Sequence, residues 1–256
     1  MKYNFFVNTT PSRLEESDCL RNAIDSLLAQ TLRPEKVYVC IPRHYRRFDV
    51  IVDEHMFPSW LRQNPQVKIL MGYDYGPASR YMYALGTGGT MCAADDDVIY
   101  KPDAFERLAD FKNSQNLDAA SNWSYLWWHW HDNDGNPKEI DFSLKYLQGV
   151  DMILTDSSFF SGFGSFLNKS HREHPDSFLY DDLTCSYYLQ YTNKSVGSLF
   201  EGDESDAVYS EQITASDETR LTDELGRGER YFKTFQIISY LKKKYPIKKL
   251  NNSVSS

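Results

Sequence analysis

The feature that most constrains the fold is a short apolar segment that ends in three consecutive carboxylates. Residues 91–94 (Met-Cys-Ala-Ala) are small or apolar, Asp95, Asp96 and Asp97 follow them directly, and a Val-Ile pair comes next. A short apolar run of this kind predicts a strand buried on both faces of a sheet. The three carboxylates would then lie at an open edge of that sheet. Because three adjacent negative charges repel one another, a stable arrangement needs a cation nearby.

The chemistry of this edge favours a hard divalent cation. Mg²⁺ and Mn²⁺ bind oxygen ligands, and they commonly use one or two carboxylates together with substrate phosphates. The alternative for any Asp triplet is a solvated acidic turn that precedes a helix. The apolar residues on both sides favour a binding site, because a surface turn seldom follows a buried strand directly.

Composition excludes several classes of protein. The 256 residues suffice to bury a core as one large domain or two small ones, and 18 Tyr, 15 Phe and 5 Trp favour a globular protein that handles ligands. The net charge of −8 argues against nucleic acid as a partner. The only basic clusters are residues 43–47 and 242–244. No apolar stretch is long enough to span a bilayer.

Cysteine usage indicates the compartment. The four cysteines are far apart in the sequence, and none has CxxC spacing. A zinc site or a disulfide framework is therefore not expected, and a reducing, cytoplasmic environment fits best.

The hydrophobic pattern alternates between strands and helices. It predicts strands at residues 3–7, 36–41, 67–71, 118–122 and 150–155, and helices at 17–28, from 77, from 103 and at 228–245. Strand–helix–strand units build parallel sheets, and ligands bind beyond the carboxyl ends of their strands. The predicted fold class is therefore α/β. The polar residues 201–227 are expected to form a mobile segment.

Two further segments are expected at the same edge of the sheet. Thr9, Thr10 and Arg13 follow the first strand, where they form either a binding loop or a plain connection. Arg80 lies in the first turn of the helix that Pro77 opens. An arginine there is either solvated or, together with helix N–H groups, a phosphate ligand.

Three later segments allow both a structural and a functional interpretation. The aromatic residues 123–131 indicate either strand packing or a stacking platform for a sugar ring. Glycines at 162 and 164 would let the backbone come close to a neighbouring group, because glycine has no side chain. Asp181 and Asp182 precede a predicted helix, where an N-cap at Asp182 is the structural explanation.

In the order and spacing of these motifs the chain resembles the GT-A glycosyltransferases. The resemblance is to the small nucleotide-sugar transferases of bacteria and large DNA viruses, and it covers about residues 3–195. It implies one GT-A, Rossmann-like catalytic domain with a mixed, mostly parallel sheet flanked by helices. In that domain residues 1–115 would bind the nucleotide-sugar, residues 116–200 would face the acceptor, and residues 201–256 would form a mobile segment and a C-terminal helix.

The resemblance also assigns roles to the donor-side residues. It implies a nucleotide-sugar donor, most often a UDP-sugar, held with Mn²⁺ or Mg²⁺. The implied donor-side residues are Thr9, Thr10 and Arg13 beside the nucleoside, Arg80 beside the diphosphate, Asp95 beside the ribose or donor sugar, Asp96 as a further donor-binding residue, and Asp97, with Asp95, on the metal.

On the acceptor side, the resemblance makes Asp182 the general base for a hydroxyl of a glycan or a related acceptor. Asp181, which stands where this family more often has Glu, would serve structure or acceptor binding. A single displacement would invert the anomeric centre.

Two other functions use the same residues differently. A metal-dependent nucleotidyltransferase or phosphoesterase would employ the Asp cluster without sugar transfer. A pyrophosphorylase usually has a glycine-rich loop after the first strand, and residues 8–13 contain no glycine. A non-catalytic carbohydrate-binding module would use the aromatic residues 123–131 and would need no metal.

Overall fold

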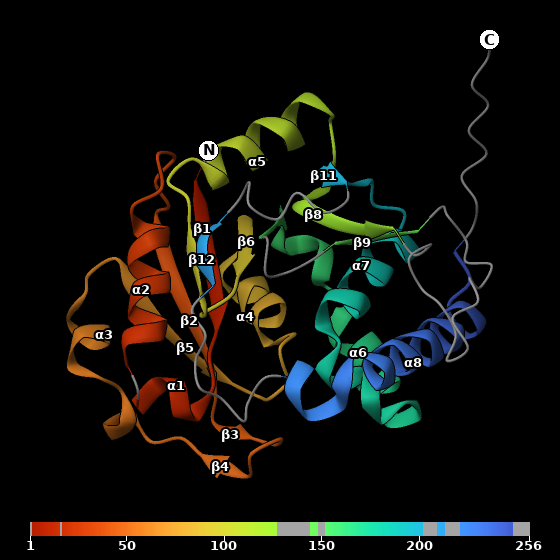
Figure 1. Cartoon of the computed structure of the whole chain (residues 1–256), viewed down its shortest axis with the longest axis horizontal. Coiled ribbons are helices and arrows are strands. Elements are labelled where there is room, and N and C mark those ends of the chain that lie inside the picture. The colour runs from red at the N-terminus through yellow and green to blue at the C-terminus, as the bar shows by residue number, and fades with distance from the viewer. Residues whose placement is uncertain are drawn as a thin grey trace.

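The computed structural model describes residues 2–15, 17–126, 144–147, 152–201, 209–212 and 221–247. Its centre is an eight-stranded sheet with the order β11-β8-β10-β6-β1-β2-β5, and β9 pairs with β8 (Figure 1). The strands are β1 (Tyr3–Asn8), β2 (Lys36–Pro42), β5 (Val67–Gly72), β6 (Thr90–Ala94), β8 (Ala119–Leu126), β9 (Lys145–Leu147), β10 (Ile153–Asp156) and β11 (Val196–Glu201).

The sheet is mixed and mostly parallel. Strands β5, β2, β1 and β6 run parallel to one another, and β11 runs parallel to β8. Strand β10 is antiparallel to both β6 and β8, and it joins the two halves of the sheet. Two small ribbons complete the strands: β3 (His44–Tyr45) with β4 (Val50–Ile51), and β7 (Val98–Tyr100) with β12 (Tyr209–Gln212).

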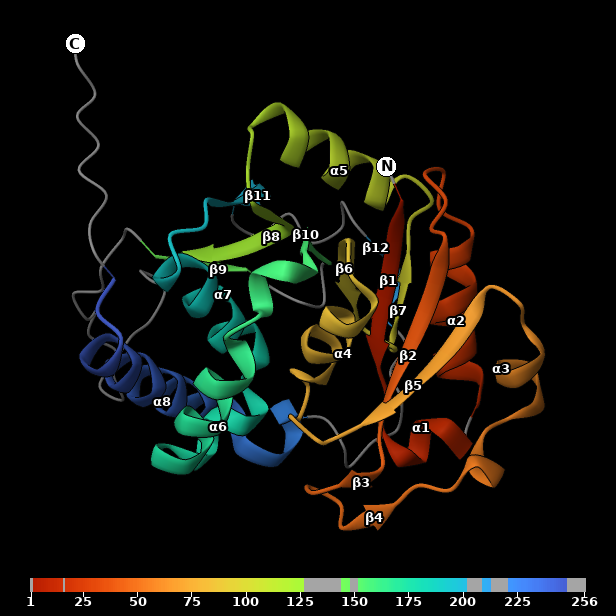
Figure 2. The same ribbon diagram turned by 180° about the vertical axis from the view of Figure 1, so that it is seen from behind.

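Helices cover both faces of the sheet (Figures 1 and 2). The α-helices are α1 (Pro11–Glu15), α2 (Ser17–Leu28), α3 (Ser59–Gln63), α4 (Ser79–Thr87), α5 (Ala104–Ser114), α6 (Phe163–Glu173), α7 (Asp181–Tyr191) and α8 (Leu221–Lys244). Short 3-10 helices are η1 (Glu54–Met56), η4 (Ser157–Phe160) and η5 (Pro175–Leu179). None of the described helices combines the length and apolarity needed to cross a bilayer.

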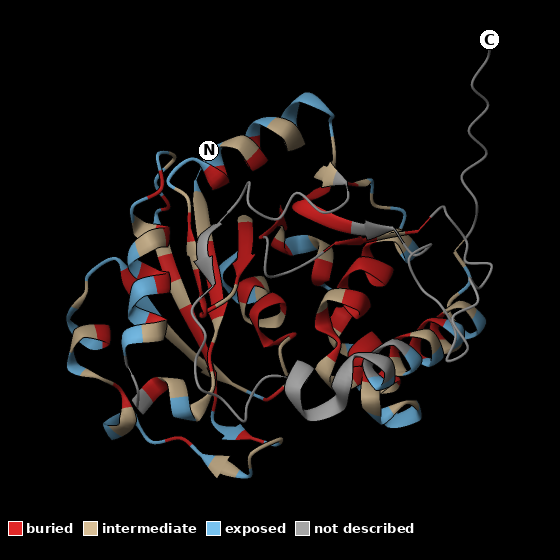
Figure 3. Ribbon diagram, viewed as in Figure 1, coloured by how far each residue is buried: buried red, intermediate tan, exposed pale blue. Residues whose placement is uncertain are grey.

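The period of two along the strands divides the core into two layers. In β1, Phe6 packs on the side of α4, α6, α7 and α8, whereas Phe5 and Val7 pack on the side of α2, α3 and α5. Because successive strand residues point to opposite faces, a strand covered on both faces has a nearly continuous run of apolar residues, such as residues 5–7 of β1. The burial colouring in Figure 3 shows this buried sheet between helices whose outer faces are exposed.

Two segments contain more regular structure than the sequence indicates. The loop after β1 is limited to Thr9 and Thr10, because α1 begins at Pro11, a residue whose fixed φ suits the first helical position. The segment 201–227 is not wholly irregular either: β12 pairs with β7, the strand just after the Asp triplet, and α8 begins at Leu221. Pairing with a distant strand leaves little signal in the local sequence. The four cysteines all lie within the described residues, and no disulfide joins them to one another.

The turn before α4 requires glycine, and a second glycine provides a control. Gly76 and Gly88 both have a positive φ, of +64° and +71°. A Cβ on Gly76 would meet the carbonyl oxygen of Phe178 well inside van der Waals contact, whereas nothing lies within 4 Å of one on Gly88. We expect Gly88→Ala to cost about 1–3 kcal/mol of unfolding free energy from backbone strain alone. Gly76→Ala should cost about 2 kcal/mol more.

Urea unfolding of the two variants checks this difference. Equal losses would mean that the contact between Gly76 and Phe178 does not constrain the fold.

Candidate active site

The site lies where the carboxyl ends of β1 and β6 meet. Val7 of β1 is in register with Ala94 of β6, so Thr9 and the Asp triplet leave the sheet side by side. Strands β2 and β5 continue the sheet from β1, while β10 and β8 continue it from β6. In α/β sheets the crevice at such a reversal of strand order is where ligands bind. The predicted neighbourhood of Thr9 and the Asp triplet is therefore present.

Arg13 closes one side of this edge. Its guanidinium, on α1, donates to a carboxylate oxygen of Asp96 and, over 3.1 Å, to Oδ2 of Asp97. Burial alone would lower the pKa of Arg13, but the charges of Asp96 and Asp97 raise it. Burial raises the pKa of Asp96, and Arg13 opposes that shift. Arg13 and these two carboxylates thus form one charge-compensated group.

Arg80 joins the Asp triplet to the late acidic pair. Its Nη1 lies 2.6 Å from Oδ1 of Asp95, and its Nη2 lies 2.6 Å from Oδ2 of Asp181 and 3.2 Å from Oδ1 of Asp182. The arginine side chain is only 4% exposed. Burial would lower the pKa of Arg80, and the charge of Asp181, followed by Tyr81, Asp95 and Asp182, raises it. Arg80 therefore stays cationic in the interior.

The acidic pair at the start of α7 does not cap the helix. Asp181 and Asp182 both lie in its first turn, Tyr180 occupies the N-cap position, and no side chain there makes a capping hydrogen bond. The structural explanation for Asp182, an N-cap, is thus wrong, because its carboxylate is bound to Arg80 instead. The side chain of Asp182 is 21% exposed, against 10% for Asp181. Burial raises the pKa of Asp181, and Arg80 opposes this.

The loop after β1 is held in place from two sides. The hydroxyl of Tyr45, in β3, donates to the backbone carbonyl of Thr9 over 2.8 Å. The side-chain amide of Asn8 donates to the carbonyl of Pro77, just before α4. The Thr10 hydroxyl accepts from the backbone N–H of Arg13 over 3.4 Å, which fixes the start of α1. Thr9 and Thr10 therefore border the edge on a supported loop.

The carboxylates of the site are of the kind that a hard divalent cation prefers. Among the described residues, five carboxylates (Asp95, Asp96, Asp97, Asp181 and Asp182) share two guanidinium groups. All the donors are hard oxygen atoms, which suits Mg²⁺ or Mn²⁺. Within the described residues, no group of three or more His, Cys, Asp or Glu side chains is placed to hold a metal ion by itself. Mg²⁺ in particular is usually held by one or two carboxylates and substrate phosphates rather than by such a cage.

Two other predicted features lie elsewhere. The glycines at 162 and 164 are close to other side chains of the protein. A Cβ on Gly162 would lie 2.8 Å from the Tyr188 hydroxyl, and a Cβ on Gly164 would lie 2.9 Å from Met82 Cε. They let α6 pack closely on α7 and α4. Of the aromatic residues 123–131, Trp123 is buried in β8, and residues 127–131 lie outside the described part of the chain.

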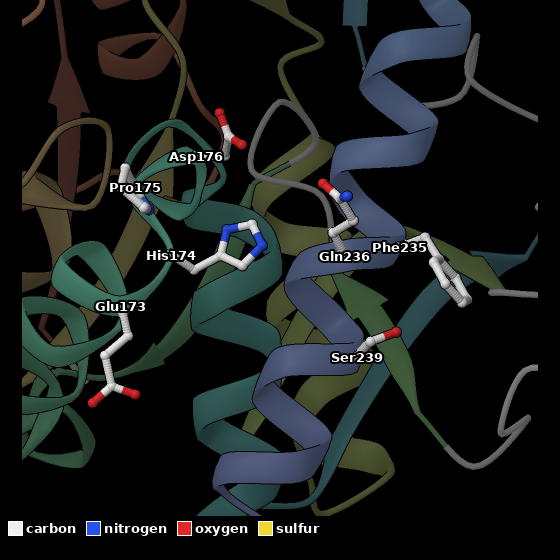
Figure 4. A pocket seen from close by; sticks show the side chains of 7 residues that line it. All are labelled: Glu173, His174, Pro175, Asp176, Phe235, Gln236 and Ser239. Atoms are coloured by element: carbon white, nitrogen blue, oxygen red, sulfur yellow. The ribbon is translucent and has the colours of Figure 1, made fainter.

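A cavity of about 500 Å³ lies between η5 and α8 (Figure 4). Glu173 and Asp176 line it on one side, and Gln236 and Ser239 of α8 line it on the other. Both acids are paired with lysines of α8, Glu173 with Lys244 and Asp176 with Lys233. These ion pairs connect α8 to the rest of the fold, and the cavity includes none of the carboxylates at the sheet edge.

Comparison with known proteins identifies the fold. No protein-family profile and no curated protein matches the sequence. Among solved structures, S. aureus TarS 1–349 in complex with UDP-GlcNAc is similar, with a TM-score of 0.54 and 15% identity over 97% of this chain and 68% of that chain. The chain has the GT-A fold. The predicted fold class, and the resemblance on which it rested, are confirmed.

A second crystal structure of S. aureus TarS has a TM-score of 0.51 and 14% identity over 97% of this chain. This chain spans 41% of that TarS chain, and it spans 60% of another structure of TarS 1–349. The structural neighbours are glycosyltransferases.

Sequence reasoning missed the connection between the two acidic groups. It placed Arg80 at the edge and Asp181 and Asp182 at a helix start, but it did not pair them. It also missed Tyr45 as a support for Thr9. Its position inside the basic cluster 43–47 was the available signal. A buried tyrosine usually has a hydrogen-bond partner for its hydroxyl.

Proposed function

We propose that the protein is a glycosyltransferase that moves a sugar from a UDP-sugar to a hydroxyl of a glycan or a related acceptor. The observation that carries the proposal is that Arg80 forms ion pairs with Asp95 and with the Asp181–Asp182 pair at the edge of a GT-A sheet. It brings a donor-side carboxylate and an acceptor-side carboxylate to one cation. That TarS binds UDP and UDP-GlcNAc on a similar fold supports UDP as the nucleotide.

The chain's own residues then divide the reaction between them. Thr9, Thr10 and Arg13 border the nucleoside on the supported loop after β1. Asp182 is the general base, because it is the more exposed carboxylate of the pair and can reach an acceptor hydroxyl. Asp181 is more deeply buried and orients Arg80. An acceptor activated on the face opposite the leaving diphosphate inverts the anomeric centre.

Asp97 and Asp95 are the residues that would hold Mn²⁺ or Mg²⁺. When bound, the ion stabilises the charge that develops on the departing nucleoside diphosphate. Arg80 contributes differently from the diphosphate contact that the sequence predicts, since carboxylates occupy both of its terminal nitrogens. Its proposed role is to hold Asp182 at a fixed position and to offset the repulsion between the three carboxylates that it binds.

Thermal stability with nucleotide-sugars tests the proposal. A UDP-sugar at a hundred times its Kd should add about 2.7 kcal/mol of stability in the presence of Mn²⁺, which is roughly 5–10 °C in Tm for a chain of this size. EDTA should remove most of that shift, because it chelates the ion that Asp97 and Asp95 would hold for the diphosphate. The absence of any shift across a panel of UDP-sugars with Mn²⁺ would contradict the proposed donor.

Asp97→Asn should abolish the Mn²⁺-dependent part of the UDP shift, because an amide is a much weaker ligand for a hard cation. Asp110→Asn is the matched control, since Asp110 is an exposed aspartate on α5, away from the site. A full Mn²⁺-dependent shift in Asp97→Asn would show that the metal ligand lies elsewhere.

A product assay separates the alternative activity. Release of sugar phosphate from a UDP-sugar without transfer to a hydroxyl would identify a phosphoesterase instead of a glycosyltransferase.

A further inference from the structure

The turn between β3 and β4, with the residue just before β3, carries two exposed arginines, Arg43 and Arg46. We call residues 43–51 the basic hairpin. Arg43 and Arg46 are exposed, and within the described part of the chain neither guanidinium forms an ion pair. His44 pairs with Asp49 over 2.9 Å.

Arg46 is held in a geometry that suits ligand binding. Its guanidinium lies 4.8 Å from the centroid of the Phe178 ring, and its backbone N–H donates to Asp74 over 2.7 Å. Asp74 also accepts from the N–H of Gly76, so its carboxylate serves the backbone. A guanidinium that rests on an aromatic ring keeps its in-plane N–H groups available, and these match the two oxygens of a phosphate or carboxylate.

The neighbouring histidine does not compete for that role. His171 lies against Phe178, with ring centroids 5.3 Å apart. Burial, followed by the charge of Arg46, lowers the pKa of His171 to about 4. The histidine is therefore neutral near pH 7, and the positive charge next to the Phe178 ring is that of Arg46.

The hairpin lies beside the proposed active site. Its Tyr45 holds the carbonyl of Thr9 on the donor side. Phe178, beneath Arg46, belongs to η5, which ends just before Asp181 and Asp182. Figure 1 shows β3 and β4 at the same end of the sheet as α1. The hairpin thus contacts both the donor loop and the segment that leads to the proposed base.

The charge balance of the site explains what such a hairpin would do. Arg13 and Arg80 are both bound to carboxylates, and among the described residues five carboxylates surround these two guanidinium groups. These carboxylates would repel an anionic acceptor unless cations nearby attracted it. We infer that the basic hairpin binds an anionic group, a phosphate, sulfate or carboxylate, carried by the glycan acceptor. The inference rests on the proposed transferase function, whose acceptor class it specifies.

Binding to a charged and a neutral glycan tests the inference without knowledge of the natural acceptor. We expect the protein to bind dextran sulfate and to bind unmodified dextran of the same length much more weakly. The double variant Arg43→Ala/Arg46→Ala should bind dextran sulfate about tenfold more weakly, because it loses two charge-assisted contacts. The matched control is Lys242→Ala/Lys243→Ala, which removes two charges from the other basic cluster. Its binding should be nearly unchanged.

Two outcomes would overturn the inference. Equal losses in both double variants would show that only overall charge matters and that the hairpin is not a site. An equal loss of UDP binding in the arginine variant would mean that the hairpin holds the donor diphosphate instead of the acceptor. The dextran sulfate measurement needs no donor, so its result stands apart from the UDP test of the transferase function itself.

Discussion

Replacing Asp182 by asparagine should lower turnover by roughly 10²–10⁴-fold, the usual contribution of a general base. The amide keeps the size of the side chain and can still accept a hydrogen bond from Arg80, so the fold and UDP binding should be preserved. What it cannot do is take the proton of the acceptor hydroxyl. Turnover with a nucleotide-sugar and an acceptor, together with a melting curve, measures both effects.

The neighbouring residue provides the comparison for Asp182. Asp181→Asn removes the charge that lies 2.6 Å from Arg80, so it should reduce stability more than Asp182→Asn and turnover less. Normal turnover in Asp182→Asn together with loss of turnover in Asp181→Asn would move the base by one residue.

NMR of the newly formed linkage should show an inverted anomeric configuration. Retention would exclude a single displacement.

Replacing Arg80 by methionine should cause the largest loss of stability. The side chain is 4% exposed, and its removal leaves the carboxylates of Asp95, Asp181 and Asp182 without their shared cation. Breaking a buried ion pair from one side typically costs 3–5 kcal/mol, which is roughly a 10 °C fall in Tm for a chain of this size. Urea unfolding measures the free energy.

Two further variants separate the explanations for Arg80. Arg21→Met removes an exposed arginine whose pair with Asp25 spans 3.9 Å, and it should cost no more than about 1 kcal/mol. Arg80→Met/Asp181→Asn should be more stable than Arg80→Met alone, because one stranded charge is removed as well. If Arg80→Met kept the wild-type free energy of unfolding and lost affinity for UDP but not for uridine, Arg80 would contact the diphosphate, as the sequence predicts.

The sequence by itself determined the elements and the edge at which the site lies. The apolar run at 91–94 and the βαβ order place the Asp triplet at the carboxyl end of a buried parallel strand, because strand period and crossover direction are local properties. For the same reason Thr9, Thr10 and Arg13 were expected beside it, and the register of β1 with β6 places Thr9 beside the triplet.

Only the tertiary structure decided how the charges are paired. Arg80 and Asp181 are 101 residues apart, and no periodicity connects them. Local sequence rules predict an N-cap role for Asp182, but in the folded chain the buried guanidinium of Arg80 binds its carboxylate instead. The pairing of β12 with β7 and the stacking of Arg46 on Phe178 have the same origin. Each depends on which distant segments the folded sheet edge brings together.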